Sequence, residues 1–186
     1  MTKQKIIDTF IAESGRRGDN SLSTRELATL CDIKSASLYH YFKSRELIVQ
    51  EAYRFGLAEY ATELKNVIQN TAGQDFQVCL QSLIRCVCRL YDEDPMKFSF
   101  LVSNQQSQYQ YADVIADNNI VVLIRNLISL WMDKGLITIG NADIATLSII
   151  GMISQMAIGV RFKRLPGSML DYAEDIFDLA IVILKS

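Results

Sequence analysis

The sequence contains few of the residues that interrupt helices. Only two of its 186 residues are proline and nine are glycine. Because these two residues most often end helices, their scarcity favours long helical segments. Sustained alternation of apolar and polar residues, which indicates strands, is also rare. Since 49% of the residues are apolar, we expect an all-α fold with a packed core.

Residues typical of catalytic and metal sites are also scarce. The single histidine, His40, has no cysteine or paired carboxylate at ligand spacing near it. On a helix, Cys79 and Cys86 share a face while Cys88 points elsewhere, which is poor geometry for zinc. We expect these cysteines to pack in the core, with a thiol sensor as the alternative. No nucleophile–base pair is evident, so we predict no enzyme, no catalytic residue, no metal and no cofactor.

The charge is small and unevenly spread. Residues 1–50 hold eight Lys and Arg against six Asp and Glu, a charge of +2, and residues 51–186 hold eleven against fifteen, a charge of −4. The sum is the net −2 of the chain. The net negative charge of the chain argues against a general nucleic-acid coat protein. It still allows a small, positively charged DNA-reading head on an acidic body.

Neither the first residues of the chain nor its uncharged run at 144–160 suggests a membrane protein. The first ten residues, MTKQKIIDTF, lack the apolar stretch of a signal peptide, so we expect a cytoplasmic protein. Residues 144–160 carry no charge, but this run is shorter than the ~20 residues that span a bilayer. Four polar residues interrupt it. We therefore predict a helix buried on one side by its own body and on the other by a second subunit.

Residues 22–45 carry the most specific pattern in the chain. Ser23 can cap a short helix, and Glu26 three residues later can complete a capping box. A tight turn at Asp32 follows this helix. Leu38 and Phe42, four residues apart, then give a second short helix one inward face. Two short helices joined in this way predict a helix-turn-helix, whose second helix can enter the major groove of DNA.

Apolar residues at helical spacing predict the remaining helices. We expect them at Lys3–Ser14, ended by Gly15; Arg45 to about Gln69, capped by Ser44; Phe76–Tyr91; Met96 to about Gln110; about Ala112 to Lys134; about Asn141 to Arg164; and Ser168 to nearly the end.

Three groups of residues give the first 60 residues a family resemblance. They are Ile6, Ile7, Phe10 and Gly15; Ser23-Thr24-Arg25-Glu26-Leu27-Ala28; and Ser37-Leu38-Tyr39-His40-Tyr41-Phe42-Lys43-Ser44-Arg45-Glu46. In these residues the chain resembles the TetR/AcrR family of transcriptional regulators. It departs from the family pattern in a longer loop after Gly15, in Asp32 where a glycine is common, and in Ser35 where a lysine is often found.

The resemblance implies a three-helix helix-turn-helix DNA-binding head and a larger helical ligand-binding and dimerisation body. We expect residues 1–46 to form the head and residues 47–186 the body, linked by the helix at about 45–69. Small outward residues on the second helix leave base reading to Arg25, Tyr39 and His40. The full set predicted to contact DNA is Thr24, Arg25, Lys34, Ser35, Ala36, Ser37, Tyr39, His40, Tyr41, Lys43 and Arg45.

The resemblance also implies a small-molecule cavity in the body and a dimer interface made by the last two helices. Aromatic and methionine residues at helical spacing are more often core residues, but those of the body are the candidates for the cavity. The predicted ligand-binding residues are Phe98, Tyr109, Trp131, Met152, Gln155 and Met156. The predicted dimer-interface residues are Gly151, Gly159, Phe177 and Ile181.

Together these features predict a ligand-responsive transcriptional repressor. It would bind a palindromic operator in double-stranded DNA as a homodimer and be released by a small-molecule inducer whose identity the sequence leaves open. The alternative is a protein-interaction adaptor on the same fold with little operator specificity, which the modest +2 charge of the head allows. The two hypotheses differ in whether the protein selects a DNA sequence.

Overall fold

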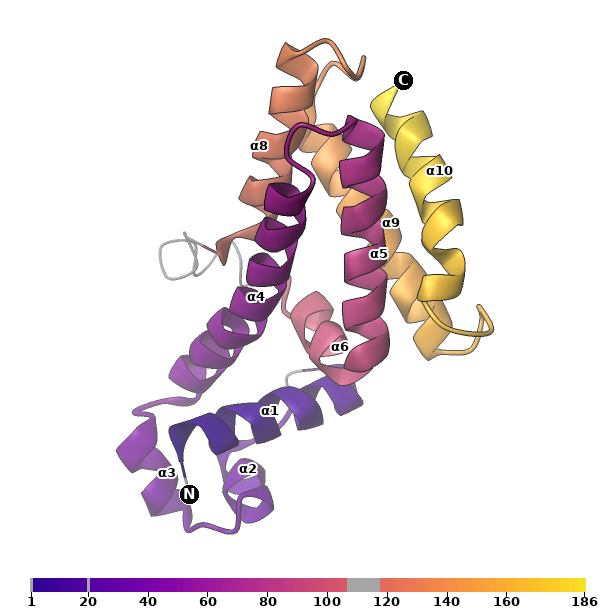
Figure 1. Cartoon of the computed structure of the whole chain (residues 1–186). Helices are drawn as coiled ribbons and strands as arrows, with labels where there is room; N and C mark the ends of the chain where they lie inside the picture. Colours follow the sequence, from indigo (N-terminus) through magenta and orange to yellow (C-terminus); the bar gives the residue numbers. More distant parts are fainter. Residues whose placement is uncertain (1, 20, 107–117) are drawn as a thin grey trace. The chain divides into compact units, whose positions relative to one another are not determined.

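A computed structural model describes residues 2–19, 21–106 and 118–186 (Figure 1). All regular elements within these ranges are helical, which confirms the all-α prediction. The elements are α1 (Lys3–Arg17), α2 (Thr24–Leu30), α3 (Ser35–Tyr41), α4 (Arg45–Asn70), α5 (Phe76–Glu93), α6 (Pro95–Ser103), α8 (Ile120–Asp133), α9 (Ala142–Arg161), the short 3₁₀ helix η2 (Leu170–Tyr172) and α10 (Ala173–Leu184).

The chain forms two compact units. The first contains α1, α2, α3, the part of α4 up to Glu59, and α6. The second contains α4 from Tyr60 onward, α5, α8, α9 and α10. The α4 helix therefore belongs to both units along the chain. The predicted domains, 1–46 and 47–186, divide the chain by function and stay a prediction.

In the first unit, α1 packs against α6. The rings of Phe10 and Phe100 meet edge to face with centroids 6.0 Å apart, and a Cβ on Gly15 would lie only 1.9 Å from the carbonyl oxygen of Met96. The prediction that Gly15 ends the first helix is wrong. The helix continues to Arg17 and ends at Gly18, which has a left-handed φ of 77°. Gly15 instead allows the two helices to approach closely.

The helix-turn-helix of the first unit forms as predicted. Both bonds of the capping box are present, because the Ser23 hydroxyl accepts from the Glu26 N–H and the Glu26 carboxylate accepts from the Ser23 N–H. Asp32 takes a left-handed φ of 53° in the turn. Aspartate adopts this conformation more readily than most residues, which explains how it replaces glycine here. The Ile33 N–H then bonds the Ala28 carbonyl and closes the turn.

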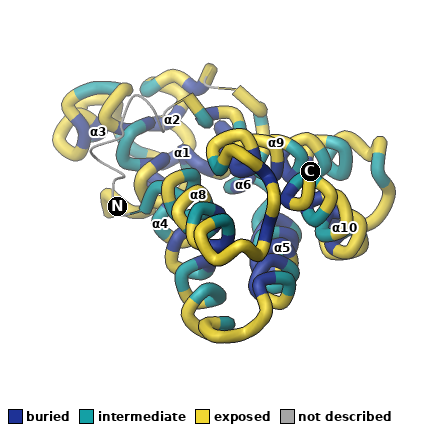
Figure 2. Tube along the Cα trace, turned by 90° about the horizontal axis from the view of Figure 1, so that it is seen from above, coloured by how far each residue is buried: buried dark blue, intermediate teal, exposed yellow. Residues whose placement is uncertain are grey.

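In the second unit, α5 is the most buried helix, and Figure 2 shows it largely in dark blue. Phe76, Leu80, Leu83 and Leu90 of this helix are buried. At one end of α5, Phe76 packs against Trp131 of α8 with ring centroids 5.6 Å apart. This contact ties the start of α5 to α8.

Three further predicted helix boundaries are wrong. The α6 helix ends at Ser103 rather than near Gln110, since the Asn104 side chain donates to the Phe100 carbonyl and the chain then turns. The α9 helix ends at Arg161 rather than Arg164, because Lys163 adopts a left-handed φ of 57°. The α10 helix begins at Ala173 rather than Ser168. The predicted start of α8 near Ala112 falls outside the described residues.

A carboxylate of α5 explains the late start of α10. The side chain of Asp92 accepts hydrogen bonds from the N–H groups of Met169 and Leu170, at 2.8 and 3.0 Å. These bonds hold the chain in a turn before α10. The α9 helix is, by length and composition alone, able to cross a membrane, a property that core helices of soluble proteins share.

Candidate nucleic-acid interface

Two side chains one turn apart anchor α3 in the first unit. Leu38 is fully buried and Phe42 is 3% exposed. Residues two positions from each point away from the core, so Ala36 and His40 are both exposed. This leaves a row of exposed residues along α3, whose tube is largely yellow in Figure 2.

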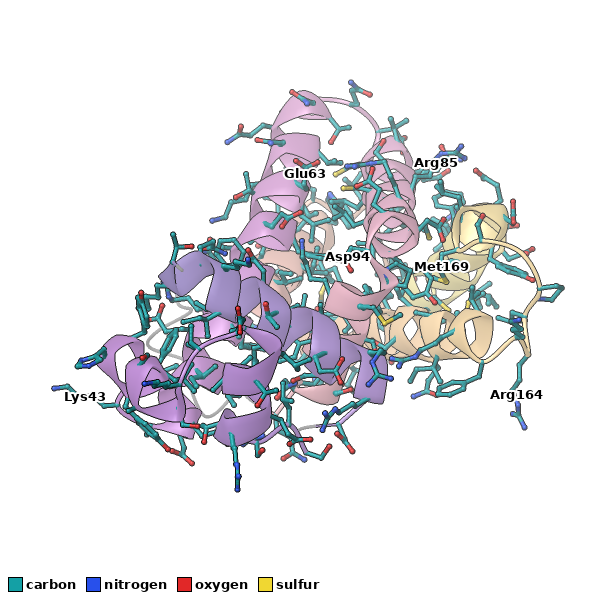
Figure 3. The ribbon with its side chains drawn as sticks, turned by 90° about the horizontal axis from the view of Figure 1, so that it is seen from below. Lys43, Glu63, Arg85, Asp94, Arg164 and Met169 are labelled. Atoms are coloured by element: carbon teal, nitrogen blue, oxygen red, sulfur yellow. The ribbon has the colours of Figure 1, made fainter. Side chains whose placement is uncertain are left out.

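The predicted DNA-contacting residues lie on α2, on α3 and around the start of α4. Figure 3 shows Lys43 projecting outward beyond the end of α3. Thr24, Ser37 and Arg45 are half-buried. The others are exposed: Arg25, Lys34, Ser35, Ala36, Tyr39, His40, Tyr41 and Lys43.

The structure brings together two of these residues from different helices. The hydroxyl oxygens of Thr24 on α2 and Tyr39 on α3 lie 3.4 Å apart. Tyr39 is 50% exposed, so the pair lies at the surface. Two hydroxyl groups at this spacing can both donate to one phosphate group of a DNA backbone.

Arg45 has a structural role that the sequence did not reveal. Its Nε donates to the carbonyl oxygen of Leu22 at 3.0 Å. This bond joins the start of α4 to the loop before α2, and Leu22 itself is fully buried. Arg45 therefore helps to position the helix-turn-helix, while its predicted phosphate contact stays a prediction.

A chain of charged side chains joins α1 to α2, and sequence reasoning missed it. Glu13 accepts hydrogen bonds from Arg16 and from Arg17, whose Nε lies 2.9 Å from its carboxylate. The Nη2 atom of the same Arg17 guanidinium donates to the Glu26 carboxylate at 3.0 Å. Helical spacing connects Glu13 to both arginines in the sequence, but no sequence signal connects Arg17 to Glu26.

These hydrogen bonds change the acidity of both carboxylates. The bonds from Arg16 and Arg17 lower the pKa of Glu13 from 4.5 to about 2. The bonds from the hydroxyl and N–H of Ser23, and then that from Arg17, lower the pKa of Glu26 from 4.5 to about 2. Both carboxylates are therefore negatively charged throughout the neutral pH range.

The structure does not gather all of the predicted ligand-binding residues into one unit. Phe98 is buried in the first unit, and Tyr109 lies outside the described residues. Trp131 is buried in the second unit, where it contacts Phe76. The burial of both Phe98 and Trp131 is also what core packing alone would give.

The remaining predicted ligand-binding residues lie on α9 of the second unit. Met152 and Met156 are half-buried, whereas Gln155 is exposed. Gln155 lies roughly opposite Ile149 and Ile153, which are buried. Gln155 therefore points away from the core of this unit.

Of the predicted dimer residues, Gly151 is the one with open space around it. A Cβ on Gly151 would meet no atom within 4 Å, whereas a Cβ on Gly159 would lie 3.1 Å from the side chain of Leu165 in the same chain. Phe177 and Ile181 of α10 are half-buried. The role of Gly159 is thus explained within one chain, whereas Gly151 is open to a partner.

Gly151 belongs to an exposed, mostly apolar row along α9, which sequence reasoning did not identify. Its members recur every three or four residues, so they share one side of the helix, and Phe162 at its end is 68% exposed. On α10, Leu179 and Val182 are also exposed. We call this row the α9 stripe: Ile144, Leu147, Gly151, Gln155, Ile158 and Phe162.

The cysteines are packing residues. Cys31, Cys79, Cys86 and Cys88 are all buried and unpaired with one another. Burial raises the pKa of the Cys79 and Cys86 thiols above the ordinary value and that of Cys88 to about 12. Such thiols form little of the reactive thiolate.

Within residues 2–19, 21–106 and 118–186, no three His, Cys, Asp or Glu side chains are grouped as metal ligands.

Comparison with known proteins identifies a family for the helix-turn-helix. Residues 6–52 match the family model described as bacterial regulatory proteins, tetR family. The HTH-type transcriptional regulator YerO of Bacillus subtilis (strain 168) is 28% identical over 72 residues. That match spans 39% of this chain and only 25% of YerO.

Solved structures resemble the fold over nearly the whole chain. FadR from Bacillus subtilis in complex with stearoyl-CoA has a TM-score of 0.80 at 15% identity, with 97% of this chain and 98% of that chain covered. AibR in complex with isovaleryl coenzyme A and operator DNA has a TM-score of 0.77 at 16% identity, with 95% and 96% covered. At these identities the likeness shows a shared fold. Residues 6–52 thus match the helix-turn-helix of the tetR family of bacterial regulatory proteins, and the chain as a whole shares its fold with FadR and AibR.

Proposed function

We propose that this protein is a ligand-responsive transcriptional repressor that binds a palindromic operator as a homodimer. The observation that carries the proposal is the exposed row on α3, anchored from behind by Leu38 and Phe42. Side chains on such a helix can reach base edges in the major groove while neighbouring cations and hydroxyls contact phosphates. The hydroxyl pair of Thr24 and Tyr39 supports a phosphate contact beside that groove.

The α9 stripe supports the homodimer. It presents apolar side chains along about five helical turns, with Gly151 near its middle leaving room for close approach. A second copy offers the same surface, as a two-fold interface requires. Leu179 and Val182 of α10 would extend this interface. Two heads held in one dimer would bind half-sites roughly 34–36 Å apart, so each head needs only modest affinity.

Release by a ligand would follow from a shift between two dimer conformations. A ligand changes this equilibrium only by as much as it prefers one conformation. Because α4 belongs to both units along the chain, it is the element through which we propose that the body controls the heads. The ligands of FadR and AibR suggest acyl-CoA thioesters as the first compounds to test.

A gel-shift assay with DNA flanking the protein's own gene tests the proposal. We expect one sequence-selective band that weakens as salt rises, because phosphate contacts release counterions. Stearoyl-CoA and isovaleryl-CoA are then added separately, with free coenzyme A as the control. Unselective DNA binding would favour the protein-interaction adaptor instead, and selective binding that no acyl-CoA alters would overturn only the proposed ligand class.

A further inference from the structure

A negative charge lies on α2, next in sequence to side chains proposed to contact DNA. Glu26 directly follows Thr24 and Arg25 on α2, and its carboxylate is held back against Ser23. One carboxylate oxygen accepts from the Ser23 N–H at 2.9 Å and from the Ser23 hydroxyl at 2.6 Å. With a pKa lowered to about 2, this group carries its charge at every pH at which the protein would bind DNA.

This charge stabilises the helix but opposes DNA binding. The capping box needs an acceptor at Glu26 to bond the Ser23 N–H. A DNA phosphate brought to Thr24 and Tyr39 has the same sign as the Glu26 carboxylate two residues further along α2, and like charges repel. The same side chain thus has one favourable and one unfavourable effect.

Arg17 lies where it can offset the unfavourable effect. Its guanidinium donates to the second carboxylate oxygen of Glu26 at 3.0 Å, and its Nε donates to Glu13 at 2.9 Å. The side chain of Arg17 is only 24% exposed. Glu13 therefore fixes the Arg17 guanidinium at the last turn of α1, facing α2.

We propose that Arg17 is a positioning residue that masks the charge of Glu26 and so allows an operator phosphate to approach α2. Arg17 itself need not touch DNA. The proposal rests on the operator binding proposed above. It differs from a merely structural role, in which Arg17 holds α2 in place, because a masking residue is needed only while Glu26 is charged.

A double-mutant cycle separates the two roles. Operator affinity is measured by fluorescence anisotropy for wild type, Arg17→Gln, Glu26→Gln and the double variant. Glutamine can still serve in a capping box, so Glu26→Gln keeps the helix start. We expect Arg17→Gln to weaken binding about fivefold at low salt, as the loss of an exposed charge interaction would. We expect the double variant to bind within about twofold of wild type.

Salt and control variants complete the test. The loss in Arg17→Gln should shrink at high salt because exposed charges are then screened. Arg17→Lys should retain most of the affinity, and Arg54→Gln, which loses the ion pair with Glu51 on α4, should bind as wild type does. Circular dichroism checks that each variant is folded. If Arg17→Gln does not fold, operator affinity is compared for Arg17→Lys and Glu26→Gln instead.

Two results would overturn the proposal. One is selective wild-type binding that Arg17→Gln leaves unchanged. The other is a double variant that binds as weakly as Arg17→Gln, since this would show that Arg17 acts only by holding α2. If wild type selects no DNA sequence at all, the proposed operator binding fails as well, so the two failures are distinguishable.

Discussion

Three exposed residues of the helix-turn-helix, Arg25, Tyr39 and His40, are proposed to contribute most to operator recognition. Arg25 on α2 and Tyr39 on α3 are both exposed, and the Tyr39 hydroxyl lies beside that of Thr24. Ser35 and Ala36 on α3 are short and exposed, so they leave long side chains to reach the DNA. Recognition at the residue scale should therefore depend on few positions.

Replacing Arg25 or Tyr39 by alanine should weaken operator binding without unfolding the protein. A lost base contact should cost ~1–3 kcal/mol of binding free energy, and a lost phosphate contact should weaken binding to all sequences and reduce the salt slope by about one. Affinity is measured by anisotropy on the same operator, with Lys134→Ala, an exposed lysine at the end of α8, as the control. Unchanged affinity in either variant would refute the role assigned to that residue.

Acid should destabilise the first unit through Glu13 and Glu26. Both pKa values are lowered from 4.5 to about 2 in the folded protein. A lowered pKa contributes stability above the unfolded value, and this contribution is lost as pH falls from about 4.5 toward 2. Urea unfolding at a series of pH values checks this. Glu26→Gln should lose less stability over this range than wild type, and an equal loss would contradict the assignment.

At the scale of elements, the contact between α1 and α6 depends on a glycine. A Cβ on Gly15 would lie 1.9 Å from a backbone oxygen of Met96. A backbone atom cannot move aside as the end of a flexible side chain can. One of the two helices must therefore shift if Gly15 is replaced.

Gly15→Ala should destabilise the protein by at least about 1–3 kcal/mol, the usual cost of overpacking. The measurement is the free energy of unfolding in urea. Gly140→Ala is the matched control, since a Cβ there meets no atom within 4 Å, and its effect should stay within about 0.5 kcal/mol. Equal stabilities of the two variants would show that α1 and α6 do not approach as described.

Sequence reasoning predicted elements whose signals are local. The capping box at Ser23 and Glu26, the buried pair Leu38 and Phe42, and the apolar face of α5 all follow from spacing along one helix. The role of Gly15 did not, because its contact with Met96 joins positions 81 residues apart. The same holds for Asp92, whose bonds to the chain before α10 set where that helix begins.

The candidate site was predictable to the same extent. The exposed row on α3 follows from its buried face, whereas the bond from Arg17 to Glu26 joins two helices whose distance the sequence does not give. The sequence shows the uncharged run of α9, but it does not show which side of this helix faces the core. Gln155 was therefore assigned to a ligand pocket although it lies on the exposed α9 stripe.

At the scale of the whole molecule, the proposed function requires two copies. Leu147 lies on the α9 stripe and is 49% exposed. A glutamate there would place a charge in a dry interface, which costs several kcal/mol unless it is paired. Leu147→Glu should therefore convert the dimer to a monomer, as measured by sedimentation equilibrium.

The control for this change is Asn126→Glu on the exposed side of α8, which should leave the dimer intact. A Leu147→Glu protein that remains dimeric would show that the α9 stripe is not the interface. The monomer should also bind operator DNA more weakly than the dimer, because two linked heads gain affinity from their high effective concentration.

Selection of binding sites from random double-stranded DNA tests the central claim most directly. The full-length protein is incubated with a pool of random duplexes, bound DNA is amplified, and the enriched sequences are read after several rounds. We predict a single palindromic motif whose half-sites repeat at the spacing of two heads, about one helical turn or somewhat more. A pool without any enriched motif, at a salt concentration where DNA is bound, would contradict the account.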